Sequence, residues 1–99
     1  MEKNKHYFYV LECKDGSYYA GYTNNIEQRI KKHNEGKGAK YTRGRGPVTL
    51  LITKEFETKG EALRAEYSFK KLKRPEKERL IAMERGDQYV AAKEFSTKL

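Results

Sequence analysis

The chain has 99 residues, of which 36% are hydrophobic and 36% charged, and its eight tyrosines and four phenylalanines are enough for one domain with a modest core. Cys13 is the only cysteine, which excludes an intrachain disulfide, and no stretch approaches the ~20 apolar residues of a membrane span. Because 22 lysines and arginines stand against 14 aspartates and glutamates, the formal net charge of +8 favours a polyanionic partner such as nucleic acid over a charge that serves solubility alone.

A β-hairpin is predicted at the start of the chain. Residues 1–6 are charged and lack the apolar run of a signal peptide, which favours a soluble, cytoplasmic protein. Residues 7–13 and 17–22 are rich in aromatic side chains and predict two strands. Asp15-Gly16 between them is a strong hairpin signal.

Two registers of this hairpin are open. A two-residue turn at 15–16 would put Tyr9 and Tyr19 on opposite faces. A three-residue loop, with Gly16 left-handed in a bulge, would put four residues on one face, namely Tyr7, Tyr9, Tyr19 and Gly21. The sequence does not decide between them.

A helix is predicted next, with Asn24 as its N-cap and Glu27 three residues on. It runs to about Asn34, and Gly36 can end it. One face carries two isoleucines that anchor the helix to the core, flanked by two polar residues, in the set Ile26, Arg29, Ile30 and His33. The Arg29 side chain could still reach solvent along its aliphatic stem.

Residues 36–47 are rich in glycine and basic side chains and have neither a helical nor a strand period. We expect a mobile, cationic loop. Its candidates for nucleic-acid binding are Lys37, Lys40, Tyr41, Arg43 and Arg45, since basic side chains contact phosphates and position a strand without reading its bases.

The second half of the chain predicts a third strand and two helices. Residues 48–56 are apolar and β-prone, and Thr58 to Glu61 form a capping box that opens a helix. Pro75 breaks that helix and suits the first turn of another, which has Leu80, Ile81 and Met83 on its apolar side, runs to about Arg85 and has Gly86 past its end.

The predicted order is therefore β-β-α-β-α-α. It indicates an α+β fold, with a small, three-stranded, mainly antiparallel sheet flanked by helices. We expect a single domain over residues 1–99, with its core at about 7–86. The tail over 87–99 is less defined, and its docking would use Tyr89, Val90 and Phe95.

One carboxylate in the first of these two helices is out of place. At about 100° per residue, a broad apolar arc contains Ala62, Leu63, Ala65, Tyr67, Phe69 and Leu72, and Glu66 falls near its middle. An ionised carboxylate that faces a core costs several kcal/mol unless it is paired or bound to a metal. Glu66 is therefore expected to meet a cation, and a basic residue such as Arg29 would serve.

The spacing of several residues carries a family resemblance. Tyr7-Phe8-Tyr9 precedes Tyr19-Ala20-Gly21, Arg29 follows ten positions after Tyr19, His33 comes one helical turn later, and Glu66 lies on a later helix. This arrangement resembles the GIY-YIG nuclease family, with the two tripeptides standing where Gly-Ile-Tyr and Tyr-Ile-Gly would be. The resemblance covers roughly residues 7–72 and is closest to small, single-domain bacterial members. Tyr7 departs from the pattern, because it puts a bulky ring where the family has glycine.

Residues 33–37 and 62–66 also look like segments of structure-specific members of the family that cut branched DNA. The resemblance implies that Glu66 binds one divalent cation, Mg²⁺ or Mn²⁺, which prefers oxygen ligands and keeps waters. It implies that Arg29 contacts a phosphate oxygen and that Tyr9 or Tyr19 helps to activate the attacking water, with His33 as the second candidate for the base. Gly21 would let a phosphate or a partner backbone come close.

These roles imply a metal-dependent endonuclease that hydrolyses DNA phosphodiester bonds, although RNA stays open as a substrate. With no separate recognition domain, it is expected to select strand structure (single strands, flaps or branches) over sequence. Taken singly, the same residues have ordinary structural interpretations. The alternative function is therefore a non-catalytic nucleic-acid-binding module that uses the basic loop and exposed tyrosines. An adaptor for an acidic protein has little support in the sequence.

Overall fold

The computed structural model describes residues 5–39 and 41–85. Several predictions lie outside these residues: the role of Lys40, the end of the last helix at Gly86, and the docking of the tail through Tyr89, Val90 and Phe95. Within the described ranges, no helix is both long and apolar enough to cross a membrane.

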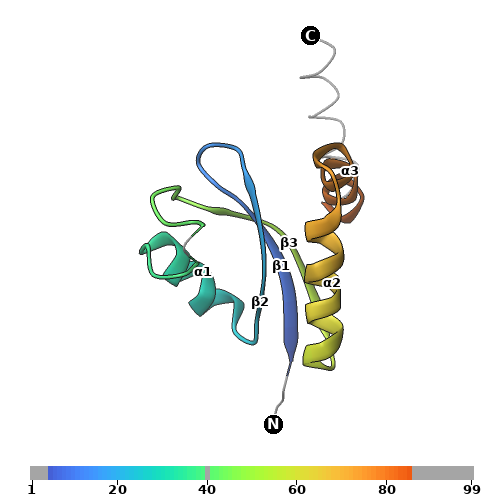
Figure 1. The fold of residues 1–99 in the computed structure, drawn as a ribbon. Helices are drawn as coiled ribbons and strands as arrows, with labels where there is room; N and C mark the ends of the chain where they lie inside the picture. Colours follow the sequence, from blue (N-terminus) through green and yellow to red (C-terminus); the bar gives the residue numbers. More distant parts are fainter. Residues whose placement is uncertain (1–4, 40, 86–99) are drawn as a thin grey trace.

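The elements of the described chain follow the predicted order. They are β1 (His6–Glu12), β2 (Tyr18–Thr23), α1 (Ile26–Asn34), β3 (Thr49–Phe56), α2 (Lys59–Lys71) and α3 (Arg74–Arg85). The strands form an antiparallel sheet in the order β2-β1-β3, so β2 and β3 are its edges. Figure 1 shows α1 on one side of the sheet and α2 and α3 on the other. The predicted α+β fold is confirmed.

The hairpin between β1 and β2 takes the bulged register. The N–H of Cys13 donates to the carbonyl oxygen of Ser17 at 2.8 Å, which leaves a three-residue loop. Gly16 closes that loop with a φ of 86°, a left-handed conformation that favours glycine. Tyr9 consequently pairs with Gly21 across the two strands, so Tyr7, Tyr9, Tyr19 and Gly21 share one face of the sheet.

Alternate residues of β1 serve two apolar clusters, one on each side of the sheet. The side that faces α2 and α3 buries Phe8, Val10, Ala20, Leu51, Ile52, Phe69 and Ile81. The side that faces α1 buries Tyr9, Leu11, Cys13 and Val48, against which Ile26 and Ile30 pack. The central strand is therefore buried on both faces, and its α1 side carries the tyrosines of the candidate site.

The helix caps match the sequence closely. Asn25, rather than Asn24, caps α1, because its side-chain oxygen accepts the N–H of Gln28 at 3.1 Å. Thr58 caps α2 as predicted and accepts the N–H of Glu61 at 3.2 Å. These side chains satisfy N–H groups that have no partner within the helix.

The apolar arc of α2 is narrower than predicted. Ala62 and Phe69 are buried, with Ala65 and Leu72 packed against the same cluster. Leu63 is 41% exposed and Tyr67 is 64% exposed, so both lie on the outer surface. The side chain of Glu66 keeps 17% exposure at the edge of the packed face and does not lie in its middle.

The apolar side predicted for α3 also needs a correction. Ile81 is fully buried and Leu80 packs against the same cluster, as expected. Met83, however, is 72% exposed. Only part of this short helix faces the sheet, so a residue two positions beyond Ile81 points away from it.

Candidate active site

The hydroxyl of Tyr9 is the centre of a buried polar cluster between β1 and α1. Tyr9 is only 1% exposed, and its hydroxyl lies 2.9 Å from Nε2 of His33. The Nε–H of Arg29 donates to the same hydroxyl at 3.3 Å. Arg29 and His33 reach Tyr9 together because they are one turn apart on the face of α1 that packs against the sheet.

Gly21 makes room for Tyr9. A Cβ atom at Gly21 would lie 2.5 Å from the Tyr9 hydroxyl oxygen and 2.6 Å from its ring carbon. The close approach predicted at this glycine therefore exists, but the group that fills it is the ring of Tyr9 on the paired strand. The approach of a phosphate or a partner backbone to Gly21 stays a prediction.

His33 is held from both ring nitrogens. Its Nδ1 lies 2.7 Å from Oγ1 of Thr42, and the Thr42 hydroxyl donates to the Ala39 carbonyl oxygen at 3.0 Å. Burial, reinforced by the charge of Arg29, lowers the pKa of His33 to about 4. His33 is therefore a neutral imidazole near pH 7.

Thr42 and Gly38 are contacts of His33 that sequence reasoning missed. Thr42 is 1% exposed although it lies in the loop, and a Cβ at Gly38 would overlap the imidazole ring. A lone threonine in a glycine-rich segment carries no periodic signal that could have identified it. The loop closes over His33 only because Gly38 has no side chain.

Tyr19 forms the outer layer of the cluster. Its ring centroid lies 5.3 Å from that of His33 and 6.4 Å from that of Tyr9. Tyr41 stacks on its outer side at 5.9 Å, with an interplanar angle of 20°. The hydrogen bond with Tyr9 raises the pKa of Arg29, and the hydroxyl of Tyr19 adds to the rise. The Arg29 guanidinium thus interacts with both tyrosine hydroxyls.

Glu66 approaches this cluster from α2. Its Oε2 accepts a hydrogen bond from Nζ of Lys70 at 2.7 Å, an (i, i+4) ion pair. The basic partner anticipated for Glu66 is thus Lys70 and not Arg29. Burial raises the pKa of Tyr9, the hydrogen bond from Arg29 opposes the rise, and the charge of Glu66 adds to it. The charge of the carboxylate therefore acts on the Tyr9 hydroxyl, with the smallest effect of the groups around it.

The donor set for a metal ion is small. The described residues contain no group of three or more histidine, cysteine, aspartate or glutamate side chains that could hold one. Glu66 is the carboxylate beside the tyrosines, and part of its side chain reaches solvent. Such a site suits a hard cation that keeps most of its waters, and it does not suit a fully protein-enclosed ion.

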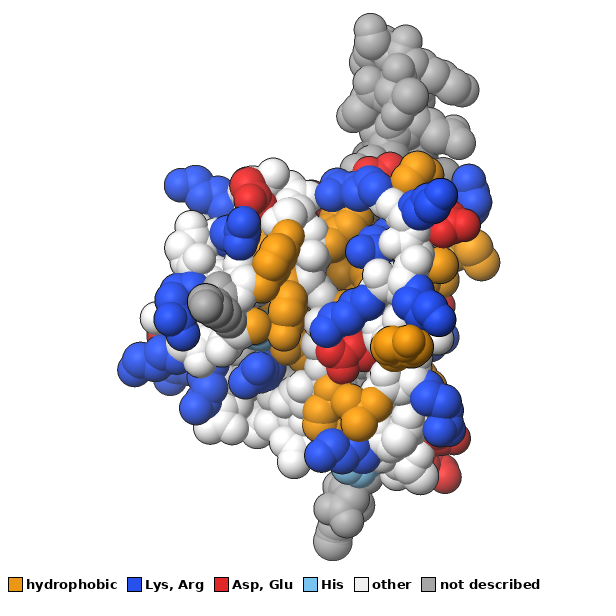
Figure 2. Space-filling view, in the orientation of Figure 1, with side chains coloured by type: hydrophobic (Ala, Val, Ile, Leu, Met, Phe, Trp, Pro, Cys, Tyr) orange, Lys and Arg blue, Asp and Glu red, His pale blue; other side chains and the backbone are white. Residues whose placement is uncertain are grey.

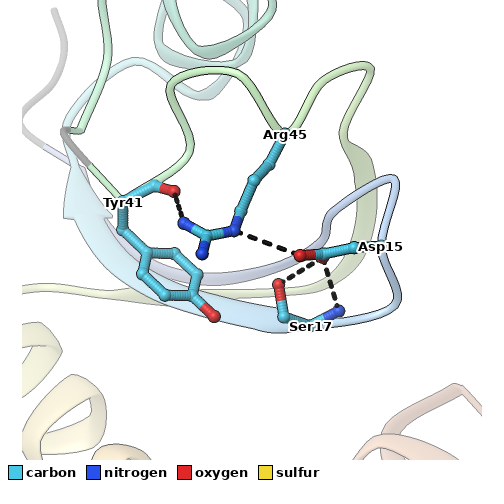
Figure 3. Close-up of polar contacts among 4 residues, drawn as sticks. All are labelled: Asp15, Ser17, Tyr41 and Arg45. Atoms are coloured by element: carbon cyan, nitrogen blue, oxygen red, sulfur yellow. Dashed lines mark hydrogen bonds and ion pairs between the residues drawn. The ribbon is translucent and has the colours of Figure 1, made fainter.

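Side-chain contacts hold the loop over residues 36–47, although the sequence predicted a mobile segment. Figure 3 shows Arg45 donating from Nε to Oδ2 of Asp15 at 3.1 Å and from Nη1 to the carbonyl oxygen of Tyr41 at 2.6 Å. Its guanidinium carbon also lies 4.4 Å from the Tyr41 ring centroid. Hydrogen bonds from Ser17, together with Arg45, hold the pKa of Asp15 at about 2.

The candidate nucleic-acid residues of the loop therefore divide by role. Arg45 is engaged with the hairpin turn, and Tyr41 is 40% exposed between Arg45 and Tyr19. Lys37 and Arg43 are exposed. Figure 2 shows lysine and arginine side chains gathered over both the α1 side and the α2–α3 side of this face, with hydrophobic side chains between them.

Comparison with known proteins identifies the family of this arrangement. Residues 5–79 match the model of the GIY-YIG catalytic domain. The chain belongs to the GIY-YIG family. A UPF0213 protein of Bacillus cereus is 62% identical over 98 residues, covering 99% of this chain and 100% of its own length. One of Bacillus licheniformis is 64% identical over 97 residues and covers 96% of this chain and 100% of its own length.

A solved structure agrees with this assignment. The solution NMR structure of the UPF0213 protein of Bacillus halodurans is 55% identical, with a TM-score of 0.58, and the match covers 86% of this chain and 90% of that chain. The sequence predicted a resemblance to small, single-domain bacterial GIY-YIG members, and these relatives are of that type.

The GIY-YIG signature departs from its pattern at Tyr7, and the structure shows where that ring lies. Tyr7 lines a shallow depression with Asn24, Asn25 and Thr53, beside the start of α1. Tyr7 therefore borders the start of α1, on the same face of the sheet as Tyr9.

Proposed function

We propose that this protein is a metal-dependent endonuclease that hydrolyses phosphodiester bonds of DNA and selects strand structure over sequence. The observation that carries the proposal is the convergence of four side chains from β1, β2 and α1, with Glu66 of α2 beside them: Tyr9, Tyr19, Arg29 and His33. Membership of the GIY-YIG family supports phosphodiester hydrolysis as the chemistry.

Glu66 is the proposed metal ligand. The carboxylate is partly exposed and has an easily displaced surface cation, Lys70, as its partner. One protein carboxylate suffices for Mg²⁺ or Mn²⁺ when waters and phosphate oxygens complete the coordination. When bound, such an ion stabilises charge on the scissile phosphate and the leaving oxygen.

Tyr19 is the proposed contact of the attacking water. Tyr9 and His33 are each 1% exposed and lie behind it, whereas Tyr19 is only half-buried. Arg29 places its guanidinium beside both tyrosine hydroxyls. The same guanidinium is suited to a phosphate oxygen once DNA is bound.

Tyr9 and His33 would position Arg29. Because the Thr42 hydroxyl donates to Ala39, its oxygen is available to accept Nδ1–H of His33. Nε2 then accepts the Tyr9 proton, and the Tyr9 oxygen is left to accept from Arg29. We prefer this assignment to one in which Nδ1 accepts the N–H of Ala39, because that contact is longer, at 3.5 Å.

A cleavage assay tests the proposal. Wild-type protein is incubated with single-stranded, flapped, branched and blunt duplex DNA, with Mg²⁺, Mn²⁺ or a chelator. We expect cleavage of the first three substrates, abolished by the chelator and by Glu66→Ala. Glu55→Ala is the matched control, because Glu55 also has one lysine partner at 2.8 Å, but on β3 at the opposite edge of the sheet.

The alternative is a nucleic-acid-binding module without turnover. Its support is the Glu66–Lys70 ion pair, which satisfies the carboxylate without a metal. This function predicts salt-dependent binding that survives Glu66→Ala and no strand scission by wild-type protein. Equal cleavage by wild type and Glu66→Ala would show a contaminating nuclease and would remove the support for catalysis.

A further inference from the structure

We infer that a pocket beside the candidate active site binds one unpaired nucleobase. The inference deepens the proposed function, because it gives a physical basis for the selection of strand structure. The pocket lies at the edge strand β2, between the loop that carries Tyr41 and the helices α2 and α3. Tyr18, Lys70 and Lys77 of this pocket have no role predicted from the sequence.

The lining of the pocket combines aromatic rings with cations. Its walls are formed by the rings of Tyr18, Tyr19, Tyr41 and Phe69 and by the side chains of Lys70 and Lys77. No carboxylate lies among these lining residues. Flat apolar rings next to ammonium groups are complementary to a flat ring attached to an anion, which is the chemistry of a nucleotide.

The size of the pocket restricts its occupant. Its volume is about 260 Å³, and it is open to solvent. That is below the ~300–1,000 Å³ of pockets that enclose a complete drug-sized ligand. The pocket therefore suits one ring system whose sugar and phosphates stay outside.

The cations are placed for the phosphates on either side of such a base. Nζ of Lys70 lies 5.8 Å from the ring centroid of Tyr19, and Nζ of Lys77 lies 5.5 Å from that of Phe69. The guanidinium carbon of Arg74, between them in the chain, lies 3.9 Å from the ring centroid of Tyr18. Three cations thus lie beside aromatic side chains that line the pocket.

Lys70 connects the pocket to the candidate active site. The same ammonium group that lines the pocket pairs with Glu66 at 2.7 Å. A base in the pocket would place a neighbouring phosphate at the Lys70 ammonium, next to Glu66. A base within a duplex is stacked and paired, and extruding it costs a few kcal/mol, so unpaired strands enter at lower cost.

Binding without metal tests the inference separately from catalysis. Fluorescence anisotropy in a chelator compares labelled (dT)6 with a six-residue abasic DNA, which has the same phosphates and so the same counterion release. We expect wild-type protein to bind (dT)6 at least fivefold more tightly, the lower end of what stacking of one base contributes. An RNA pair, (rU)6 and its abasic form, runs in parallel. A preference for bases in either backbone supports the pocket and identifies the strand it accepts.

Two variants locate the effect. Tyr41→Leu should reduce the preference for (dT)6 over the abasic strand by about threefold or more. Lys77→Gln should weaken the binding of both strands alike, because both carry the same phosphates. Tyr67→Leu is the matched control, because Tyr67 is an exposed ring with Lys71 4.9 Å from its centroid, but on the outer surface of α2. It should keep the wild-type preference.

Equal binding of (dT)6 and its abasic form by wild-type protein, in both DNA and RNA, would overturn the inference without any variant. A preference that Tyr41→Leu retains would overturn it as well. Because no metal is present, cleavage in the assay above together with equal binding here would leave the proposed nuclease standing and remove the pocket alone.

Discussion

At the scale of single residues, the neutral imidazole of His33 has a thermodynamic consequence. Its pKa is about 4 in the folded protein, against about 6.5 for an ordinary histidine. Between these two values the unfolded chain binds a proton that the folded protein does not. The free energy of unfolding therefore falls as the pH drops from 6.5 to 4 and is restored as the pH rises.

We expect this loss to be on the order of 2 kcal/mol for wild-type protein. His33→Gln, which can still hydrogen-bond to Thr42 and Tyr9, should show a flatter pH dependence over the same window. Urea unfolding at pH 4, 5, 6 and 7 measures both proteins. Parallel curves for the two proteins would contradict a buried, neutral His33.

Gly21 gives a second prediction at this scale. Gly21→Ala would put a methyl group 2.5 Å from the Tyr9 hydroxyl oxygen, so the ring must move away from Arg29 and His33. We expect a loss of about 1–3 kcal/mol in stability together with a loss of cleavage. Gly60→Ala is the control, since its nearest neighbour would be 3.8 Å away in the first turn of α2, where alanine is favoured. An unchanged Gly21→Ala protein would show that Tyr9 does not occupy this space.

At the scale of elements, local patterns predicted the strands, the helices and their caps to within one or two residues. They also placed Arg29 and His33 on one face of α1, because helical spacing alone decides that relation. The predicted burial of Leu63 and Tyr67 in α2 was wrong. Periodicity gives the angles of side chains around a helix, but not the width of the sheet that covers it.

The loop contacts could not be predicted for a different reason. Thr42 reaches His33, and Arg45 reaches Asp15, across distances set by the folded sheet, and no repeat in the sequence encodes them. The hairpin register could not be predicted for the same reason. In the structure, Gly16 has a left-handed φ of 86°, which fits the bulged register.

The brace between Arg45 and Asp15 gives a prediction about the loop as an element. Arg45→Gln and Asp15→Asn should each speed amide hydrogen exchange at Thr42 and Arg45, whose N–H groups bond within the loop. The double variant should exchange no faster than Arg45→Gln alone, since that variant already removes the Arg45–Asp15 ion pair. Exchange rates equal to wild type would show that the brace does not hold the loop.

At the scale of the whole molecule, the two sides of the sheet have different roles. The side facing α2 and α3 is the larger apolar cluster, and the side facing α1 holds the polar cluster around Tyr9. Glu66 and Lys70 stand beside the β2 edge, where the two sides meet. The net charge of +8 gives the chain as a whole a field that attracts polyanions.

Binding of single-stranded DNA should therefore depend steeply on salt. For contacts to about four phosphates, the logarithm of the association constant should fall with the logarithm of salt concentration with a slope of about −3. Anisotropy titrations with (dT)6 in a chelator, from 50 to 300 mM salt, measure it. A slope near zero would contradict an electrostatic interface, whichever strand structure is preferred.

We propose that Tyr9, Tyr19, Arg29, His33 and Glu66 form one metal-dependent site. The most direct test is a titration of ¹⁵N-labelled protein with Mn²⁺, followed by paramagnetic broadening of backbone amides. Broadening centred on Glu66 and extending to the amides of Tyr9, Tyr19 and Arg29, and absent in Glu66→Ala but present in Glu55→Ala, is the predicted result. Broadening centred elsewhere, or unchanged by Glu66→Ala, would contradict it.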